Sequence, residues 1–130
     1  MIFDVFYDMM PTFCELIGAE IPMQADGKSM LPTFLGKSQE QHDYLFWEYP
    51  EYGGQQAIRM GDWKGIRTNI KREGNLKIEL YDLSVDVLEQ NDVSDLQPEI
   101  IEKMKKIFNQ EHKESSLNRF KMKALGDKLN

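Results

Sequence analysis

The sequence has very little cysteine and histidine. Its 130 residues include one cysteine, Cys14, and two histidines, His42 and His112. A single cysteine cannot form an internal disulfide, and this set cannot supply the four ligands of a Cys/His zinc site. Long apolar runs are missing as well, since none approaches the roughly 18 to 20 residues that a membrane-spanning helix needs. We therefore predict no disulfide framework, no Cys/His zinc cluster and no membrane partner.

The first ten residues, "MIFDVFYDMM", lack the basic region and the small-residue cleavage site of a secretory signal. We therefore expect no export signal in the chain as given. A length of 130 residues, with 41% hydrophobic and 29% charged residues, is typical of a globular protein with one modest core.

The net charge of -6 is distributed unevenly along the chain. Residues 98–130 contain eight basic and five acidic side chains, whereas the residues before them contain eight basic and seventeen acidic ones. The lysines of the basic part alternate with glutamates, and its aromatic residues are only Phe108 and Phe120. This pattern is typical of a solvated helix face, and we predict no nucleic-acid partner.

A short helix is predicted from about Met9 to Ile17. Asp8 is placed to cap it, Pro11 suits its first turn and Gly18 ends it. One side of this helix is apolar and requires a partner surface, because hydrophobic residues recur at helical spacing: Met10, Phe13, Cys14 and Ile17. The stretch that follows, residues 23–42, is rich in glycine, proline and polar residues and predicts a long connection.

The chain then changes to short segments of strand character. Strands are predicted at 43–49, 55–60, 62–69 and 76–83, with Gly61 and Asp62 forming a type II′ hairpin turn. A further turn is predicted from Lys71 to Asn75. Four consecutive strands joined by short loops predict an antiparallel meander. In the last strand, Ile78, Leu80 and Asp82 are expected on one face, and Glu79 and Tyr81 on the other.

A helix of about fifteen residues is predicted from Pro98, with Glu99 favouring its first turn. Its apolar stripe consists of Ile100, Ile101, Met104, Ile107 and Phe108. The predicted fold class is therefore α+β: a four-stranded antiparallel sheet packed against a C-terminal helix, preceded by a short helix and a long connection. The expected divisions are 1–37, 38–114 and a tail at 115–130, which is either frayed or docked by Phe120, Met122 and Leu125.

Several residues suggest chemistry, but each has a simpler interpretation. Glu48 and Glu51 lie beside aromatic residues, as the paired carboxylates of glycosidases do, yet acids are common at strand ends. His42 next to Asp43 could orient a general base, although neighbours on an extended chain point to opposite sides. Cys14 is predicted to belong to the apolar helix face. The alternative, a reactive thiol, is disfavoured by its acidic neighbour.

An acidic run at 82–92, "DLSVDVLEQND", resembles a calcium loop only loosely. It lacks the regular spacing of such loops, so we interpret its carboxylates as solvated turn acids and predict no metal ligand there.

The stretch "QAIRMGDWKGIR", residues 56–67, contains three cations and a tryptophan. Strand alternation places Lys64 with Ile66 on one face and Trp63 with Arg67 on the other, so the cations do not converge on one ligand. Trp63 is expected to pack in the core, with an arginine stem against it. Arg59 and Arg67 remain candidates for binding an anionic sugar. The full set of candidate substrate-binding residues is Trp47, Glu48, Arg59 and Arg67.

Four stretches in order carry a family resemblance: "DMMPTFCELIGAEIP", "DGKSMLPTFLGK", "YLFWEY" followed by "QAIRMGDWKGIR", and "ELYDLSVDVLEQNDVSDLQPEI". They resemble the C-terminal part of the sulfatases, within the alkaline-phosphatase-like superfamily. The family patterns are D-x-x-P-T-x-x-x-x-x-G, D-G-x-S-L-x-P-x-L-x-G, A-x-R-x-G-x-W-K and E-L-Y-D-L-x-x-D-x-x-E-x-x-N. The resemblance extends from Asp8 to about Ile100.

The resemblance implies a parent enzyme that hydrolyses sulfate esters with a formylglycine and a calcium ion. The formylglycine is made from Cys or Ser in C/S-x-P/A-x-R, and Cys14 and Ser29 both lack the Pro/Ala and Arg positions of that motif. The family's metal-binding and sulfate-binding motifs have no matching positions either. No catalytic or metal-binding residue is therefore assigned in this chain, and calcium and formylglycine are expected in the parent.

By resemblance, the chain is a C-terminal fragment of a sulfatase, inactive in isolation, whose partner is the missing N-terminal catalytic domain. It would line the edge of a pocket for a sulfated glycan, since "FWEYPEYGGQQAIR" is similar to sulfatases of glycan-degrading bacteria. A periplasmic or extracellular parent is expected, and the segment 1–37 is expected to be mobile or to form a homo-oligomer. The alternative is a stand-alone sugar-binding or protein-interaction module. A complete small enzyme is disfavoured by the missing motifs.

Overall fold

The structure is a computed structural model that describes residues 5–71 and 75–129. The chain divides into two compact units, Met1–Asp43 and Tyr44–Asn130. The domain limits expected from the sequence, at 37 and 114, stay predictions. No helix in these described ranges is long and apolar enough to cross a membrane.

The first unit contains a 3-10 turn, η1 (Phe6–Asp8), the helix α1 (Met9–Ile17) and a single helical turn, α2 (Leu31–Phe34). The predicted helix at 9–17 is confirmed, and Gly18 ends it in the left-handed conformation with φ of +69°. Sequence reasoning missed α2, which lies inside the stretch predicted as a connection. A helix of four residues is too short to produce a visible hydrophobic period.

Asp8 stands at the predicted N-cap position, but its side chain does not cap α1. Its carboxylate instead accepts a hydrogen bond from the backbone N–H of Lys28 at 2.8 Å and lies 2.9 Å from Nε2 of His42. Thr12 makes a second contact with this connection, because its hydroxyl accepts a hydrogen bond from the backbone N–H of Met30 at 2.8 Å. The long connection is therefore fastened to α1 by buried polar contacts, and His42 serves as a partner of Asp8.

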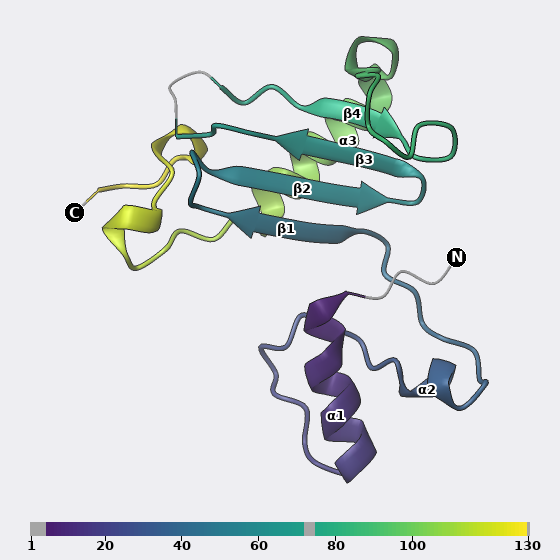
Figure 1. The fold of residues 1–130 in the computed structure, drawn as a ribbon. Coiled ribbons are helices and arrows are strands. Elements are labelled where there is room, and N and C mark those ends of the chain that lie inside the picture. Colours follow the sequence, from purple (N-terminus) through teal and green to yellow (C-terminus); the bar gives the residue numbers. More distant parts are fainter. Residues whose placement is uncertain (1–4, 72–74, 130) are drawn as a thin grey trace. The chain divides into compact units, whose positions relative to one another are not determined.

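The second unit is built on a four-stranded antiparallel sheet in the order β1 (Leu45–Tyr49), β2 (Gln55–Met60), β3 (Trp63–Arg67) and β4 (Glu79–Asp82). The predicted meander is confirmed (Figure 1). Gly61 has φ of +60° whereas Asp62 is not left-handed, as the predicted type II′ turn requires. The turn expected at 71–75 lies largely outside the described residues.

Helix α3 (Pro98–Glu111) crosses one face of this sheet, as predicted (Figure 1). Its stripe meets the inward side chains of the strands in a cluster of buried residues: Ile58, Ile78, Leu80, Met104 and Phe108. Gly65 lies directly beneath Met104, since a Cβ added there would be 2.3 Å from the methionine Sδ. The missing side chain lets helix and sheet approach closely.

The segment after α3 docks on the second unit. It contains two short 3-10 turns, η3 (Asn118–Phe120) and η4 (Lys123–Leu125). A further 3-10 turn, η2 (Ser94–Leu96), lies outside this segment, directly before α3. Of the two alternatives for this tail, docking is correct, because Met122 is fully buried. Asp127 accepts a hydrogen bond from the backbone N–H of Met122 at 2.6 Å and lies 2.8 Å from Nε2 of His112.

Candidate functional site

The two faces of the sheet differ in what covers them. Strand alternation directs one set of side chains toward α3 and the other set away from it. In the register of the sheet, Leu45 pairs with Arg59 and Arg59 with Lys64, while Trp47 pairs with Ala57 and Ala57 with Ile66. We call the side opposite α3 the open face, defined by five residues: Trp47, Ala57, Arg59, Lys64 and Ile66.

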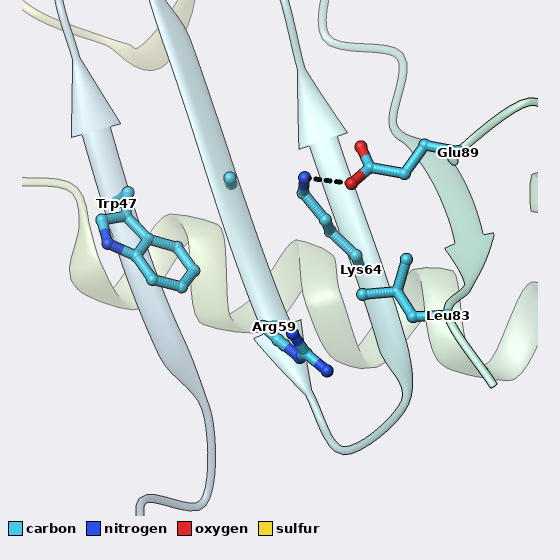
Figure 2. A pocket seen from close by; sticks show the side chains of 6 residues that line it. Trp47, Arg59, Lys64, Leu83 and Glu89 are labelled. Atoms are coloured by element: carbon cyan, nitrogen blue, oxygen red, sulfur yellow. Dashed lines mark hydrogen bonds and ion pairs between the residues drawn. The ribbon is translucent and has the colours of Figure 1, made fainter. Parts of the chain in front are cut away.

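A hollow of about 310 Å³ lies on the open face (Figure 2). Strands β1, β2 and β3 and the loop after β4 contribute to its lining, which consists of Trp47, Ala57, Arg59, Lys64, Leu83 and Glu89. Ala57 is the small residue of this set and is the cross-strand neighbour of Trp47. Its short side chain leaves room beside Trp47, which is 40% exposed.

The hollow carries both signs of charge, with an excess of positive charge. Nζ of Lys64 lies 2.5 Å from Oε1 of Glu89, and both side chains are about two-thirds buried. Glu89 has φ of +54°, a left-handed conformation that is uncommon for a residue with a side chain. The loop before it holds this geometry, because the backbone N–H of Glu89 donates to the carbonyl of Asp86 at 3.2 Å. Arg59 supplies the second cation of the lining.

A smaller hollow of about 110 Å³ adjoins the first along β1. The two share Trp47 and Ala57, and the smaller one is completed by Tyr49, Gln55, Gln56 and Ile66. The ring of Tyr49 stacks with that of Tyr52, with centroids 6.1 Å apart and an interplanar angle of 23°. The open face therefore continues from a cationic end to an aromatic end.

The four candidate substrate-binding residues divide between the two faces. Trp47 and Arg59 line the larger hollow together. Glu48 lies on the face that α3 covers, where its Oε2 accepts from Nε2 of Gln56 at 2.6 Å and lies 2.8 Å from Nδ1 of His112. The structure does not bring Glu48 and Arg67 to the hollow.

Arg67 is 4% exposed. Its guanidinium carbon lies 4.4 Å from the centroid of the Phe108 ring, and one terminal nitrogen donates to Oε1 of Gln56 at 3.4 Å. Its Nε is buried and has no hydrogen-bond partner among the residues described. Burial lowers the pKa of this guanidinium below its ordinary value. Trp63 packs against the core on the same side, as predicted.

Sequence reasoning placed Lys64 on the correct face but did not include it, or Glu89, among the site residues. Alternation could have found Lys64, because it neighbours Arg59 across β2 and β3. Glu89 gave no signal, since its position depends on a left-handed backbone in an irregular loop.

Two carboxylates of the acidic run at 82–92, those of Asp82 and Asp86, accept hydrogen bonds within their own loop. Asp82 accepts from the backbone N–H of Ser84, and Asp86 accepts from those of Gln90 and Asn91. The Asn91 and Gln90 backbone bonds lower the pKa of Asp86. Within 5–71 and 75–129 no group of three or more His, Cys, Asp or Glu side chains is arranged so that it could hold a metal ion.

Comparisons of the sequence and of the structure with known proteins point to the same family. The family model for the C-terminal region of N-sulphoglucosamine sulphohydrolase matches residues 1–115. An ulvan-active sulfatase from Formosa agariphila is 39% identical over 41 residues, which are 32% of this chain and 8% of that protein.

Solved structures agree with this result. A Bacteroides thetaiotaomicron protein classed as a sulfatase is 25% identical with a TM-score of 0.66, covering 77% of this chain and 22% of its own. A 2-O GAG sulfatase is 25% identical with a TM-score of 0.65 over the same shares. The chain therefore spans less than a quarter of the length of these proteins.

Proposed function

Because the chain belongs to the family of N-sulphoglucosamine sulphohydrolase C-terminal domains, we propose that it is the C-terminal subdomain of a sulfatase. In this role it helps to hold the sulfated carbohydrate whose sulfate ester the enzyme hydrolyses. The observation that carries the proposal is the hollow on the open face, where a half-exposed tryptophan lies beside two cations.

The chemistry of the hollow suits a sulfated sugar. A guanidinium presents a planar set of donors that matches two oxygens of a sulfate group, so we assign Arg59 as the main sulfate contact. Lys64 contributes less, because Glu89 already neutralises much of its charge. The indole of Trp47 offers an apolar face for the C–H groups of a sugar ring and a polar N–H at its edge.

We assign Glu48 and Arg67 a role in positioning the strands that carry the binding residues. Phe108, Arg67, Gln56, Glu48 and His112 form a chain of contacts beneath β1, β2 and β3. These contacts hold β1 and β2 together, and the same strands carry Trp47 and Arg59 on their opposite face. We infer that Glu48 and Arg67 affect binding through the spacing of these strands.

The residues of this chain do not fit a calcium ion or a formylglycine. The described part of the chain offers no group of His, Cys, Asp or Glu side chains that could hold a metal ion, and neither Cys14 nor Ser29 has the neighbours that formylglycine formation requires. Both groups are expected in the catalytic part of the enzyme, and we derive no chemical step through them. The proposal therefore includes no hydrolysis by this chain alone.

The partner that we propose is the catalytic domain of the same enzyme. Helix α1 presents exposed apolar side chains that require cover: Met10, Phe13, Leu16 and Ile17. We assign this surface to the catalytic domain, and a concentration-dependent dimer of the chain in light scattering would point to a second copy instead. By analogy with exported sulfatases, the proposed location of the parent enzyme is the periplasm or the cell exterior.

Isothermal titration calorimetry of the 130-residue chain with a sulfated oligosaccharide and with its desulfated form tests the proposal. The sulfated form should bind and the desulfated form should bind more weakly. Arg59→Ala should abolish the difference, whereas Arg119→Ala, an exposed arginine in the docked tail, should leave it unchanged. Equal affinity for both forms, or no affinity for either, would overturn a sulfate-binding role.

A further inference from the structure

Strand β1 ends in an aromatic cluster beside the hollow. Trp47 and Tyr49 share a face because they are two residues apart on a strand. Tyr52 then stacks on Tyr49 from the turn that follows, and Tyr52 is 81% exposed. Large exposed aromatic side chains that lie close together on a surface are a common sign of a binding site.

The turn that carries Tyr52 is held in an unusual conformation. Tyr52 has φ of +48°, and Gly53 and Gly54 continue in left-handed conformations at +88° and +77°. Two backbone hydrogen bonds fix the turn to the chain after β3, from Ile70 to the carbonyl of Gly54 and from Lys71 to that of Gly53. This conformation is sterically unfavourable for a tyrosine. The structure therefore keeps an exposed ring in a defined place.

The aromatic cluster is continuous with the cationic hollow. The smaller hollow, lined by Tyr49 and Gln55, shares Trp47 and Ala57 with the larger one. Trp47 therefore stands between Arg59 on one side and Tyr49 on the other. The surface is elongated along β1, with positive charge at one end and stacked rings at the other.

A ligand that matches both ends has an anionic group on one unit and an apolar ring face on the next. Sugar rings present such faces through their C–H groups, and their hydroxyls suit the exposed amide of Gln55 and the phenol groups. Charge complementarity with Arg59 requires that the neighbouring unit be anionic.

We propose that Tyr49 and Tyr52 form a second saccharide subsite, which binds the unit next to the sulfated one. This inference rests on the proposed function, since it takes the sulfated unit to occupy the larger hollow. It adds that the chain recognises at least two adjacent sugar units, with Trp47 contacting both.

The test compares a sulfated monosaccharide with an oligosaccharide that contains the same sulfated unit. The unmodified chain should bind the longer ligand about three- to tenfold more tightly. Tyr52→Ala should remove this gain and leave the affinity for the monosaccharide unchanged. Tyr52→Phe keeps the ring and should retain most of the gain, which separates stacking from a change in folding. Arg59→Ala should weaken both ligands.

The two proposals fail in different ways. If both ligands bind with equal affinity and Tyr52→Ala changes neither, the second subsite is wrong while the sulfate site stands. If Arg59→Ala also changes nothing, or neither ligand binds, the sulfate site is wrong and the subsite is overturned with it. Because Tyr52 is largely exposed, Tyr52→Ala should fold normally, and Tyr49→Ala provides an independent second variant.

Discussion

The ammonium group of Lys64 lies 2.5 Å from the carboxylate of Glu89, and the pair forms one wall of the hollow on the open face (Figure 2). A bound anion would approach both groups. The attraction of Lys64 would be opposed by the repulsion of Glu89, so the pair contributes little net charge to the hollow.

Glu89→Gln removes the negative charge of the hollow without changing the size of the side chain. The affinity for a sulfated saccharide should rise about two- to fivefold, the range expected for a partly exposed charge interaction. Glu102→Gln is the matched control, because Glu102 also pairs with a lysine, Lys105, but lies on α3. Calorimetric titration measures both. An affinity that falls in Glu89→Gln would show that the ion pair organises the site.

Arg67 lies on the face that α3 covers, so we expect its substitution to affect stability more than saccharide binding. Arg67→Ala should lower the free energy of unfolding by about 1–3 kcal/mol, because it removes packing on Phe108 and leaves Gln56 without a donor. Urea denaturation measures this loss. The saccharide affinity of the folded variant should change far less than in Arg59→Ala. Equal losses of affinity with unchanged stability would place Arg67 in the binding site.

His112 predicts a pH dependence of stability. Burial by itself lowers the pKa of this imidazole, but hydrogen bonds and charges from Asp127 and Glu48 outweigh burial and raise it above its ordinary value. Protonated His112 therefore stabilises the fold below the unfolded-state pKa, and this contribution is lost as the pH rises through the raised folded-state pKa.

The comparison of urea midpoints at mildly acidic and mildly alkaline pH measures this effect. The unmodified chain should be more stable on the acidic side, and His112→Gln should show a smaller difference between the two conditions. A pH dependence that is identical in both proteins would contradict the assigned role of His112.

The contact between Gly65 and Met104 predicts an overpacked core in Gly65→Ala. The new methyl group would lie 2.3 Å from Sδ of Met104, so the variant should lose about 1–3 kcal/mol of stability. The double variant Gly65→Ala with Met104→Val has a shorter opposing side chain and should regain part of the lost stability. A double-mutant cycle by urea denaturation gives the coupling energy. Additive effects of the two substitutions would contradict direct contact.

The elements that sequence predicted correctly are those with a local signal. The stripe on α3, the alternation on β4 and the glycine at the end of α1 depend on neighbours within one or two turns of chain. The four-residue helix α2 has too few residues for such a signal.

The site was predictable only in part, for a related reason. Trp47 and Arg59 could be selected by residue type, but the register that joins them across β1 and β2 is a property of the whole sheet. Arg67 has the same residue type as Arg59, yet Arg67 and Glu48 lie on the other face of the sheet. The contact between His112 and Asp127 depends on how the tail docks, which no local pattern encodes.

The most direct test of a carbohydrate-binding open face uses the two tryptophans, Trp47 and Trp63, which lie on opposite faces of the sheet. Titration of the ¹⁵N-labelled chain with a sulfated oligosaccharide follows the indole N–H signal of each residue. We predict that the Trp47 signal shifts in a saturable manner and that the Trp63 signal does not. An unmoved Trp47 signal, or a larger shift at Trp63, would contradict binding at the hollow.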